Sequence, residues 1–262
     1  MNILDKIIAD KFKEVELKKS LIPVPQLENS VLFKRECISL AENLKKGSGI
    51  IAEHKRRSPS KSVINQSLNV QEVAKGYEEA GVSGISVLTD GKYFGGSLED
   101  LLYARASVEI PILRKEFMID EYQVLEAKSF GADAILLIAA VLTEKQLIYL
   151  ADIAKNLGMD VLLEIHNEEE LQKSLKVNAD MIGVNNRSLK TFEVSIDTSK
   201  VLAKLIPDEF VKVSESGISS TSAIADLKSY GFKGFLIGEN FMKTDNPGAA
   251  AKEFITELKS IV

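Results

Sequence analysis

The stretch Gly131-Ala-Asp-Ala-Ile-Leu-Leu-Ile-Ala-Ala-Val-Leu142 carries the pattern from which the fold can be worked out. Its first residue is a glycine, which tolerates the positive φ of a left-handed helix cap. The longest apolar run of the chain, Ala134 to Leu142, follows at once and is too short to cross a bilayer. We therefore interpret the stretch as the end of one helix followed directly by a buried strand.

The same joint between a helix and a strand recurs along the chain. Glycine or asparagine precedes an apolar run at four further places, which are Gly81, Gly158, Asn178 and Gly231. Each of these residues is expected to adopt the left-handed conformation of a helix cap. Leaving Gly158 aside, the joints recur about every 50 residues, which is roughly the length of two strand–helix units.

Eight short apolar or β-branched runs alternate with helical patterns. The predicted strands are Ile50–Glu53, Ile85–Leu88, Ile110–Arg114, Ala134–Ile138, Val161–Ile165, Met181–Val184, Phe210–Ser214 and Phe235–Gly238. Buried strands that alternate with helices indicate an α/β fold with a parallel sheet, and eight such units favour a closed (β/α)8 TIM barrel. A doubly wound open sheet is the alternative. Such sheets usually carry a glycine-rich loop after the first strand, where this chain has Arg56-Arg-Ser-Pro-Ser-Lys61.

Residues 1–48 precede the first strand and are predicted to form an N-terminal helical extension. Apolar residues recur there at helical spacing, namely Ile3, Leu4, Ile7, Ile8, Phe12 and Val15. A second helix is expected over Phe33–Leu44. The extension should cover the N-terminal mouth of the barrel or one of its rims. The sequence has no linker or low-complexity tract, so residues 1–262 are predicted to form a single domain.

Composition excludes several classes of function. The net charge is −5 and no basic stripe is present, so we expect no nucleic-acid partner. The N-terminus lacks the apolar core of a signal peptide or a membrane span, and no membrane partner is expected. A single cysteine, Cys37, excludes an intramolecular disulfide and fits a reducing, cytoplasmic setting; we expect it to be a small buried residue of the second helix. A monomer is expected rather than an oligomer.

Function in such a barrel gathers at the C-terminal ends of the strands. Polar and charged residues follow seven of the eight predicted strands, and the fourth strand ends in apolar residues. The polar ends are Glu53-His-Lys55, Thr89-Asp90, Arg114-Lys-Glu-Phe117, Glu164-Ile-His166, Asn185-Asn-Arg187, Ser214-Glu-Ser-Gly217 and Gly238-Glu239. Lysines and glutamates in one cavity can hold one another's charges and divide acid from base roles. Taken alone, Glu53 with Lys55 suits a solvated ion pair at the rim, and Lys115 suits such a pair as well as a general acid.

Other residues at the mouth have simpler interpretations. His54 and His166 are expected to be structural. The loops that follow the seventh and eighth strands, at Gly217 and Gly238, are a common place for phosphate in this fold, although either could be an ordinary turn. No cluster of His, Cys and carboxylate residues has metal-ligand spacing, so no metal is expected.

Six segments together resemble one known family. Ile50–Lys61 resembles the first-strand signature of the indole-3-glycerol-phosphate synthases. The other segments resemble its later strands in the same order: Ser86–Asp90 with Tyr93–Ser97, Pro111–Phe117, Leu162–His166, Ile182–Arg187 and Val213–Ile218. The resemblance runs from about residue 50 to the end, and the N-terminal extension fits it too.

The resemblance implies a reaction. Members of that family act on an anthranilate-bearing deoxyribulose phosphate, close an indole ring, and release carbon dioxide and water without a cofactor or metal. Lys115 would be the general acid, Lys55 and Glu164 would act in the loss of water at steps left unassigned, and Glu53 would orient the lysines. Substrate positioning would fall to Asn185, Arg187, Glu215, Ser216, Phe117 and Pro59, and phosphate binding to Ser58, Gly217, Gly238 and the backbone of Glu239.

Two related barrels and one function of another class are the alternatives. Phosphoribosylanthranilate isomerase uses a cysteine at the first strand, where this chain has Glu53 and Lys55. The tryptophan synthase α-subunit works with two carboxylates and leaves the lysines unexplained. A catalytically silent binder of a phosphorylated ligand would bind a substrate analogue without turnover.

Overall fold

The computed structural model describes residues 3–188 and 192–261, so residues 1, 2 and 262 of the predicted domain lie outside it, as do residues 189–191. Eight parallel strands follow one another around a closed barrel, and β8 pairs back to β1. The strands are β1 (Ile50–His54), β2 (Gly84–Leu88), β3 (Ile112–Lys115), β4 (Ala134–Ile138), β5 (Asp160–Ile165), β6 (Met181–Asn185), β7 (Val211–Glu215) and β8 (Gly234–Ile237). Closure confirms the predicted barrel and excludes the open sheet.

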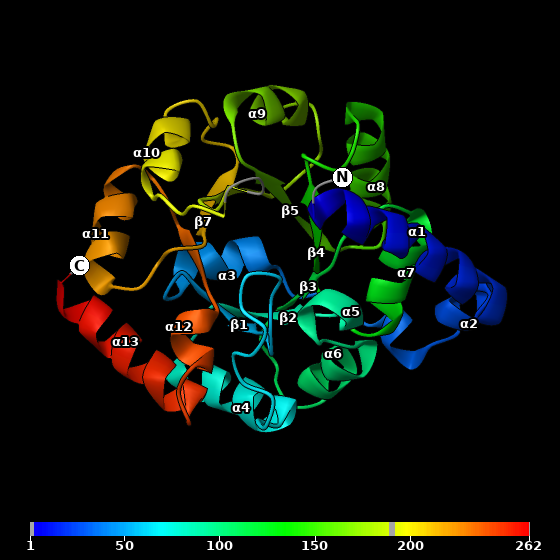
Figure 1. Ribbon diagram of the computed structural model, residues 1–262, viewed down its shortest axis with the longest axis horizontal. Helices are drawn as coiled ribbons and strands as arrows, with labels where there is room; N and C mark the ends of the chain where they lie inside the picture. Colours follow the sequence, from blue (N-terminus) through cyan, green and yellow to red (C-terminus); the bar gives the residue numbers. More distant parts are fainter. Residues whose placement is uncertain (1–2, 189–191, 262) are drawn as a thin grey trace.

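Helices surround the barrel, as the view along its axis shows (Figure 1). Four helical elements precede β1: α1 (Ile3–Leu21), α2 (Val24–Glu28), the 3-10 turn η1 (Val31–Lys34) and α3 (Leu40–Lys46). The others are α4 (Val70–Ala80), α5 (Gly91–Phe94), α6 (Leu98–Arg105), α7 (Glu121–Ser129), α8 (Glu144–Asn156), α9 (Glu168–Ser174), α10 (Asp197–Ala203), α11 (Thr221–Ser229), α12 (Glu239–Met242) and α13 (Pro247–Ile261). No helix among the described residues is long and apolar enough to cross a membrane.

The glycine joints adopt the predicted left-handed conformation, but the asparagine joint does not. The glycines have φ values of 83°, 86°, 76° and 89° at Gly81, Gly131, Gly158 and Gly231, respectively. Asn178 does not have a positive φ, so that prediction is wrong. The reason is local, because α9 ends at Leu175 in the right-handed conformation and the chain turns there through a hydrogen bond from Val177 to Ser174.

The prediction of one helix over Phe33–Leu44 is also wrong. The chain forms the short turn η1, runs without helix over residues 35–39, and begins α3 only at Leu40. Asp133 explains the break, because its carboxylate accepts hydrogen bonds from the Ile38 backbone at 2.8 Å and from Arg35 at 2.5 Å. Cys37 therefore lies outside any helix and is only half-buried, contrary to the prediction.

The N-terminal extension reaches both ends of the barrel. Helix α3 packs under the N-terminal mouth, where Leu40 and Leu44 join the apolar interior of the strands. Gly84 and Gly234 leave the room for this packing, since a Cβ on Gly84 would collide with Leu40 and one on Gly234 would lie 3.1 Å from Leu44. Helix α1 instead reaches the C-terminal mouth, where its first residues line a cavity. Both predicted locations are therefore occupied, each by a different helix.

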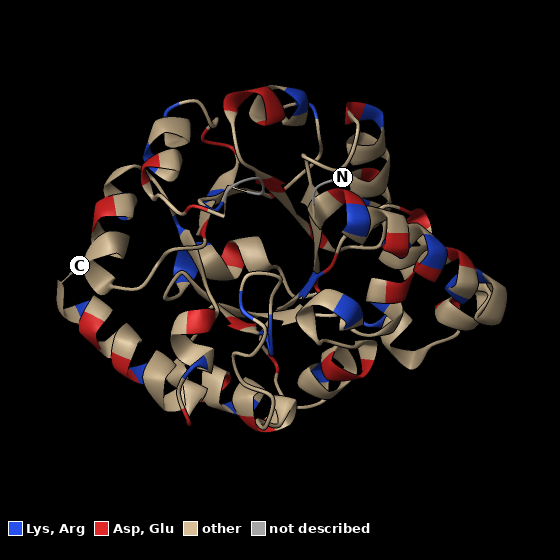
Figure 2. Ribbon diagram, in the orientation of Figure 1, with Lys and Arg blue, Asp and Glu red and all other residues tan. Residues whose placement is uncertain are grey.

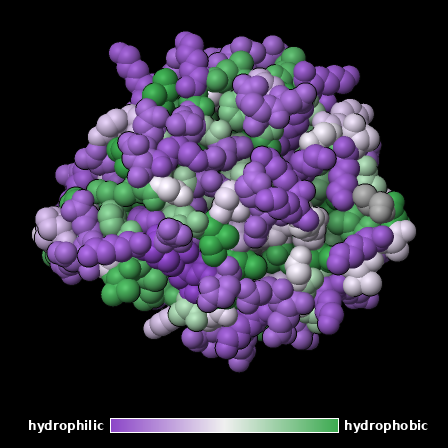
Figure 3. All heavy atoms as spheres, turned by 180° about the vertical axis from the view of Figure 1, so that it is seen from behind, coloured by the Kyte–Doolittle hydropathy of each residue, from purple (hydrophilic) through white to green (hydrophobic). Residues whose placement is uncertain are grey.

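The face of the molecule opposite to that of Figure 1 is predominantly hydrophilic, with hydrophobic side chains in patches between the polar ones (Figure 3). The N-terminal mouth is closed by α3, so the open end of the barrel is the C-terminal one.

Candidate active site

A cavity of about 410 Å³ opens at the C-terminal ends of the strands. Every residue that the sequence analysis placed in the site lines this cavity. They are Glu53, Lys55, Ser58, Pro59, Lys115, Phe117, Glu164, Asn185, Arg187, Glu215, Ser216, Gly217, Gly238 and Glu239. The location of these residues therefore agrees with the sequence analysis, whereas their individual roles stay predictions.

Lys115 occupies the centre of the charged part of the cavity. Its ammonium group donates a hydrogen bond to Glu215 and lies 3.5 Å from Oε2 of Glu164. Beside this group, Lys55 forms an ion pair with Glu53 at 2.5 Å. Figure 2 marks where charged residues lie along the strands and the surrounding helices. Two ammonium groups and three carboxylates thus share one mostly buried space.

Carboxylates outnumber ammonium groups in this cavity. The direction in which each pKa is shifted indicates which groups are charged. Burial disfavours the charge of Lys115, but Glu215, Glu164 and Glu53 outweigh burial and raise its pKa. Burial would likewise raise the pKa of Glu53, but Lys55 and Lys115 lower it below its ordinary value. For Glu215 burial prevails over the attraction of Lys115 and raises the pKa to about 7. Lys115 therefore stays cationic, and Glu215 holds a proton more readily than Glu53 does.

Two glycines leave room for these carboxylates. A Cβ on Gly183 of β6 would collide with the carboxylate of Glu215, and one on Gly238 would collide with that of Glu53. Neither glycine needs its backbone freedom for a left-handed conformation. What these positions require is the absence of a side chain, because any Cβ would displace a charged group of the cavity.

The loop after β1 is held against α6 and the turn between α5 and α6. Arg56 forms a two-pronged ion pair with Asp100 and also donates to the carbonyl of Gly95 at 3.1 Å. This arrangement raises the pKa of Arg56 through its hydrogen bond with Asp100. Ser58 and Pro59, which follow in the same loop, reach the wall of the cavity.

The backbone after β7 is strained where it borders the cavity. Ser216 has a φ of 67° and Gly217 one of 77°, so a non-glycine residue sits in the left-handed region directly beside a glycine. Such strain is typical of functional turns. On the facing loop, the side chain of Glu239 pairs with Lys61 at 2.7 Å.

The sequence analysis missed several residues of this part of the wall. Ser219, Asn240 and Lys243 line the cavity; Ser219 and Asn240 directly follow the motifs, and Lys243 lies four residues after Glu239. No spacing rule places them at the mouth, since their orientation depends on how the loops after β7 and β8 fold back.

Apart from Phe117 and Pro59, the apolar side of the cavity was not predicted. The strand β4, which ends without charged residues, contributes Leu136 and Ile138. Helix α1 adds Ile3, Leu4 and Ile7, which belong to the apolar stripe of the extension. The stripe itself is visible in the sequence, but nothing in it says that the stripe faces the cavity and not a neighbouring helix.

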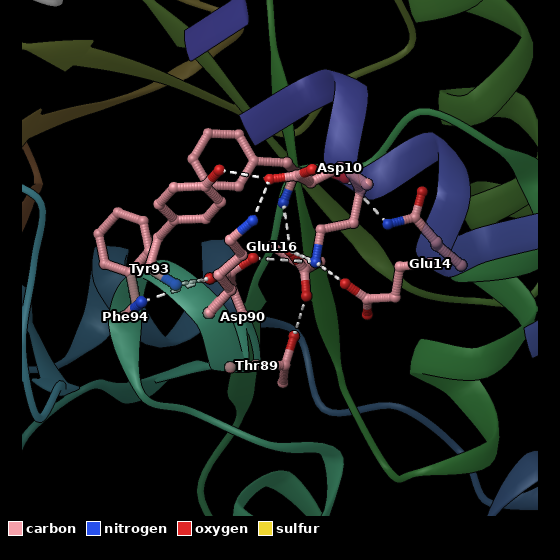
Figure 4. A network of polar contacts seen from close by, with 12 residues as sticks. Asp10, Glu14, Thr89, Asp90, Tyr93, Phe94 and Glu116 are labelled. Carbon is pink, nitrogen blue, oxygen red and sulfur yellow. Dashed lines mark hydrogen bonds and ion pairs between the residues drawn. The ribbon is translucent and has the colours of Figure 1, made fainter. Parts of the chain in front are cut away.

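A buried ion cluster fixes α1 in this place (Figure 4). Lys11 is 1% exposed, and its Nζ lies 2.7 Å from Glu14, 3.0 Å from Asp90 and 3.1 Å from Glu116. Asp90 follows β2 and Glu116 follows Lys115, so one lysine ties the extension to two strand ends. A second contact joins Tyr93 of α5 to Asp10 of α1 at 2.5 Å.

The two histidines differ in their surroundings. Burial lowers the pKa of His54 to about 4, so this side chain is neutral, and its Nε2 atom has no hydrogen-bond partner. His166 lies between two carboxylates, Glu164 and Glu170. Within residues 3–188 and 192–261, no group of three His, Cys, Asp or Glu residues is arranged to hold a metal ion.

Comparison with known proteins identifies one family. A family model described as "Indole-3-glycerol phosphate synthase" matches residues 4–254. A curated protein of that name from Bacteroides thetaiotaomicron is 48% identical over 259 residues, which are 98% of this chain and 99% of the relative. Relatives of the same name from Caldanaerobacter subterraneus and Polaromonas naphthalenivorans are 45% and 42% identical, each over 98% of this chain and 99% of its own length.

Solved structures that are more distant share the fold. The crystal structure of KGPDC from Streptococcus mutans has a TM-score of 0.60 and 16% identity, and it covers 73% of this chain and 92% of its own. A native KDPGal structure has a TM-score of 0.56 and 14% identity, covering 80% and 92%. At such identities the likeness concerns the barrel alone.

Proposed function

The chain belongs to the indole-3-glycerol phosphate synthase family, and from this premise we propose that Lys115 is the general acid of its reaction. The enzyme is a carboxy-lyase of tryptophan biosynthesis. It converts 1-(2-carboxyphenylamino)-1-deoxyribulose 5-phosphate to indole-3-glycerol phosphate by ring closure, decarboxylation and dehydration. The observation that carries the proposal is the position of Lys115, whose ammonium group lies in the cavity between Glu215 and Glu164.

Ring closure requires a proton on the sugar carbonyl. As the aryl carbon attacks, negative charge develops on the carbonyl oxygen, and an ammonium group held nearby can protonate it. Lys115 remains cationic because three carboxylates surround it, so it carries the proton that this step needs. Glu53 holds Lys55 by their ion pair, and its charge is one of those that raise the pKa of Lys115.

Dehydration requires both an acid and a base. Glu164 and Lys55 are the groups that we assign to this step, with the order of their action left open. Glu164 is 4% exposed and lies 3.5 Å from Lys115, so a proton taken up by Glu164 can return to the lysine within the cavity. Asn185, Arg187 and Ser216 line the same space and are proposed to position the intermediate.

The two ends of the cavity suit the two ends of the substrate. The apolar wall formed by α1, Phe117 and β4 suits the aromatic ring. We place the phosphate at Ser58, Gly217, Gly238 and the backbone of Glu239, where Lys243 adds positive charge to the wall. The carboxylate of Glu239 pairs with Lys61, which reduces its repulsion of a phosphate.

The partner is thus a phosphorylated small molecule. We further propose that the enzyme works in the cytoplasm as a monomer, without nucleic acid, membrane, metal or cofactor. Its single cysteine, its acidic charge and the position of all the proposed catalytic residues on one chain support this view.

Glu164→Gln tests the assignment of the acid–base groups. The amide keeps the shape of the side chain but cannot take up a proton, so turnover should fall at least about 10²-fold. The assay follows indole absorbance and fluorescence after the substrate is mixed with purified protein. Glu144→Gln, on the outer helix α8, is the control and should leave turnover unchanged. Near-normal turnover of Glu164→Gln would remove this residue from the mechanism.

A further inference from the structure

His166 lies beside Glu164, one of the proposed acid–base groups. It follows the last residue of β5, and its side chain is 11% exposed. The Nδ1 atom lies 3.0 Å from Oε2 of Glu170, and the Nε2 atom lies 3.5 Å from Oε1 of Glu164. The imidazole ring thus connects a carboxylate that lines the cavity with a carboxylate of α9.

The two oxygens of Glu164 face two different partners. Oε2 lies 3.5 Å from the ammonium group of Lys115, whereas Oε1 faces the imidazole. The Nε2 atom of His166 is buried and has no hydrogen-bond partner of normal geometry. Oε1 of Glu164, 3.5 Å away, is the acceptor that a proton on this nitrogen would have, and the carboxylate would then lie between two cations.

Capping of α9 does not require this orientation of the ring. The helix N-terminus is already capped by Asn167, whose Oδ1 accepts the Glu170 N–H at 2.9 Å. Glu170 is also fixed by the His166 backbone N–H at 2.9 Å and by Nδ2 of Asn167 at 3.0 Å. The side-chain bond from Glu170 to the imidazole is additional to these contacts, and it sets which way Nε2 points.

The charges around His166 favour its protonated form. The titratable groups that face it are Glu164 on its own strand, Glu170 on α9 and, farther away, Glu215 on β7. Burial disfavours the imidazolium, but the hydrogen bond to Glu170 and the charges of the carboxylates outweigh burial and raise the pKa of His166.

We propose that protonated His166, held by Glu170, is a positioning residue that keeps the carboxylate of Glu164 aimed into the cavity. The inference rests on the proposed function, because it matters only if Glu164 takes up a proton during turnover. The imidazolium donates its Nε2–H to Oε1 and leaves Oε2 for Lys115 and the substrate. When His166 loses its proton at higher pH, this hydrogen bond is lost and kcat falls.

Two titrations measured on the same samples test the proposal. The chain has two histidines, so NMR can follow each imidazole, and kcat can be measured over the same pH range. In the wild type, the alkaline decline of kcat should coincide with the titration of His166. Glu170→Gln should move both midpoints to lower pH by the same amount, roughly half to one pH unit.

Glu169→Gln is the matched control. Glu169 is exposed and lies in the same turn of α9, so this substitution removes the same charge without changing a contact of the imidazole. Neither midpoint should move in that variant. The pKa of Glu215 is also near neutral, but Glu170 is not among the groups that shift it, so a decline caused by Glu215 would keep its midpoint in Glu170→Gln. A kinetic midpoint that stays fixed while that of His166 moves would overturn the inference.

His166→Asn provides the second test. We expect kcat to fall about tenfold, less than the 10²–10⁴-fold of a group that transfers the proton itself, with KM nearly unchanged and the alkaline decline abolished. A lower kcat with the wild-type pH profile would mean a purely structural role and would refute the proposal. If Glu164→Gln retains turnover, the proposed role of Glu164 fails and this inference fails with it; if Glu164→Gln is inactive while His166→Asn behaves as wild type, only this inference fails.

Discussion

The Nζ atom of Lys11 lies 3.0 Å from Oδ2 of Asp90, although one residue belongs to the N-terminal extension and the other follows β2. Both side chains are almost fully buried, with exposed fractions of 2% and 3%. An ion pair at this depth is a fixed joint, because separating the charges would leave each without a partner in a poorly solvated place. Helix α1 is therefore part of the cavity wall, anchored to Asp90 and to Glu116, the residue after Lys115.

Replacing Lys11 tests this joint. Lys11→Met keeps the length and apolar stem of the side chain but leaves Asp90 and Glu116 without their cation. We expect the free energy of unfolding, measured with urea, to fall by about 3–5 kcal/mol. Because Ile3, Leu4 and Ile7 then lose their fixed position at the cavity, KM should rise more than kcat falls. Lys13→Met, at an exposed position of the same helix, serves as control.

An unchanged KM in a folded Lys11→Met protein would show that α1 is not part of the substrate site. An unchanged stability would show that the buried charges find other partners. Both quantities are needed, since an enzyme that is merely less stable would lose active molecules without a change in KM.

Glu215 should make stability depend on pH in an unusual direction. Its pKa is about 7 in the native state, against about 4.3 in an unfolded chain. Between these values the native state binds one more proton than the unfolded state, so stability falls as pH rises through this window. Relative to wild type, Glu215→Gln should gain about 1–3 kcal/mol between pH 4.5 and 7, and then level off. Denaturation at several pH values measures the difference, and a constant difference would contradict the raised pKa.

Gly183 should be intolerant of alanine for a chemical reason. The added methyl group would collide with the carboxylate of Glu215 and displace it from Lys115. We expect Gly183→Ala to fold and to lose about tenfold or more in kcat, since displaced acid–base groups act poorly. Gly91→Ala is the control, because its Cβ would meet only the Gly96 carbonyl at 3.4 Å. Normal turnover of Gly183→Ala would mean that the position of Glu215 is unimportant.

The barrel could be predicted because each strand is a buried apolar run, and β2, β4, β5 and β8 start a few residues after a left-handed glycine. Such runs depend on local sequence, and the strand bounds agree with the structure to within two residues even where they differ, as at Ile112 and Val211. The break at residues 35–39 could not be foreseen, because it depends on Asp133, which is distant in sequence. The right-handed end of α9 is another case, since an asparagine permits a left-handed cap without requiring one.

The candidate site was likewise predictable in part. Charged residues at strand ends could be assigned to the mouth because parallel strands of a barrel end at one rim. The apolar half of the cavity could not, since Leu136 resembles any core residue and Ile7 any residue of an amphipathic helix. The bridging position of His166 was also missed, because its ring orientation depends on Glu170, four residues away on the next helix.

The turnover of Lys115→Met tests the central claim most directly. The variant removes the ammonium group and keeps the apolar stem, and Lys46→Met on α3, a highly exposed lysine, is the control. We predict that the rate of indole fluorescence increase falls at least about 10²-fold in Lys115→Met, with an intact fold by circular dichroism, and is unchanged in the control. A folded Lys115→Met protein with near-normal turnover would contradict the account.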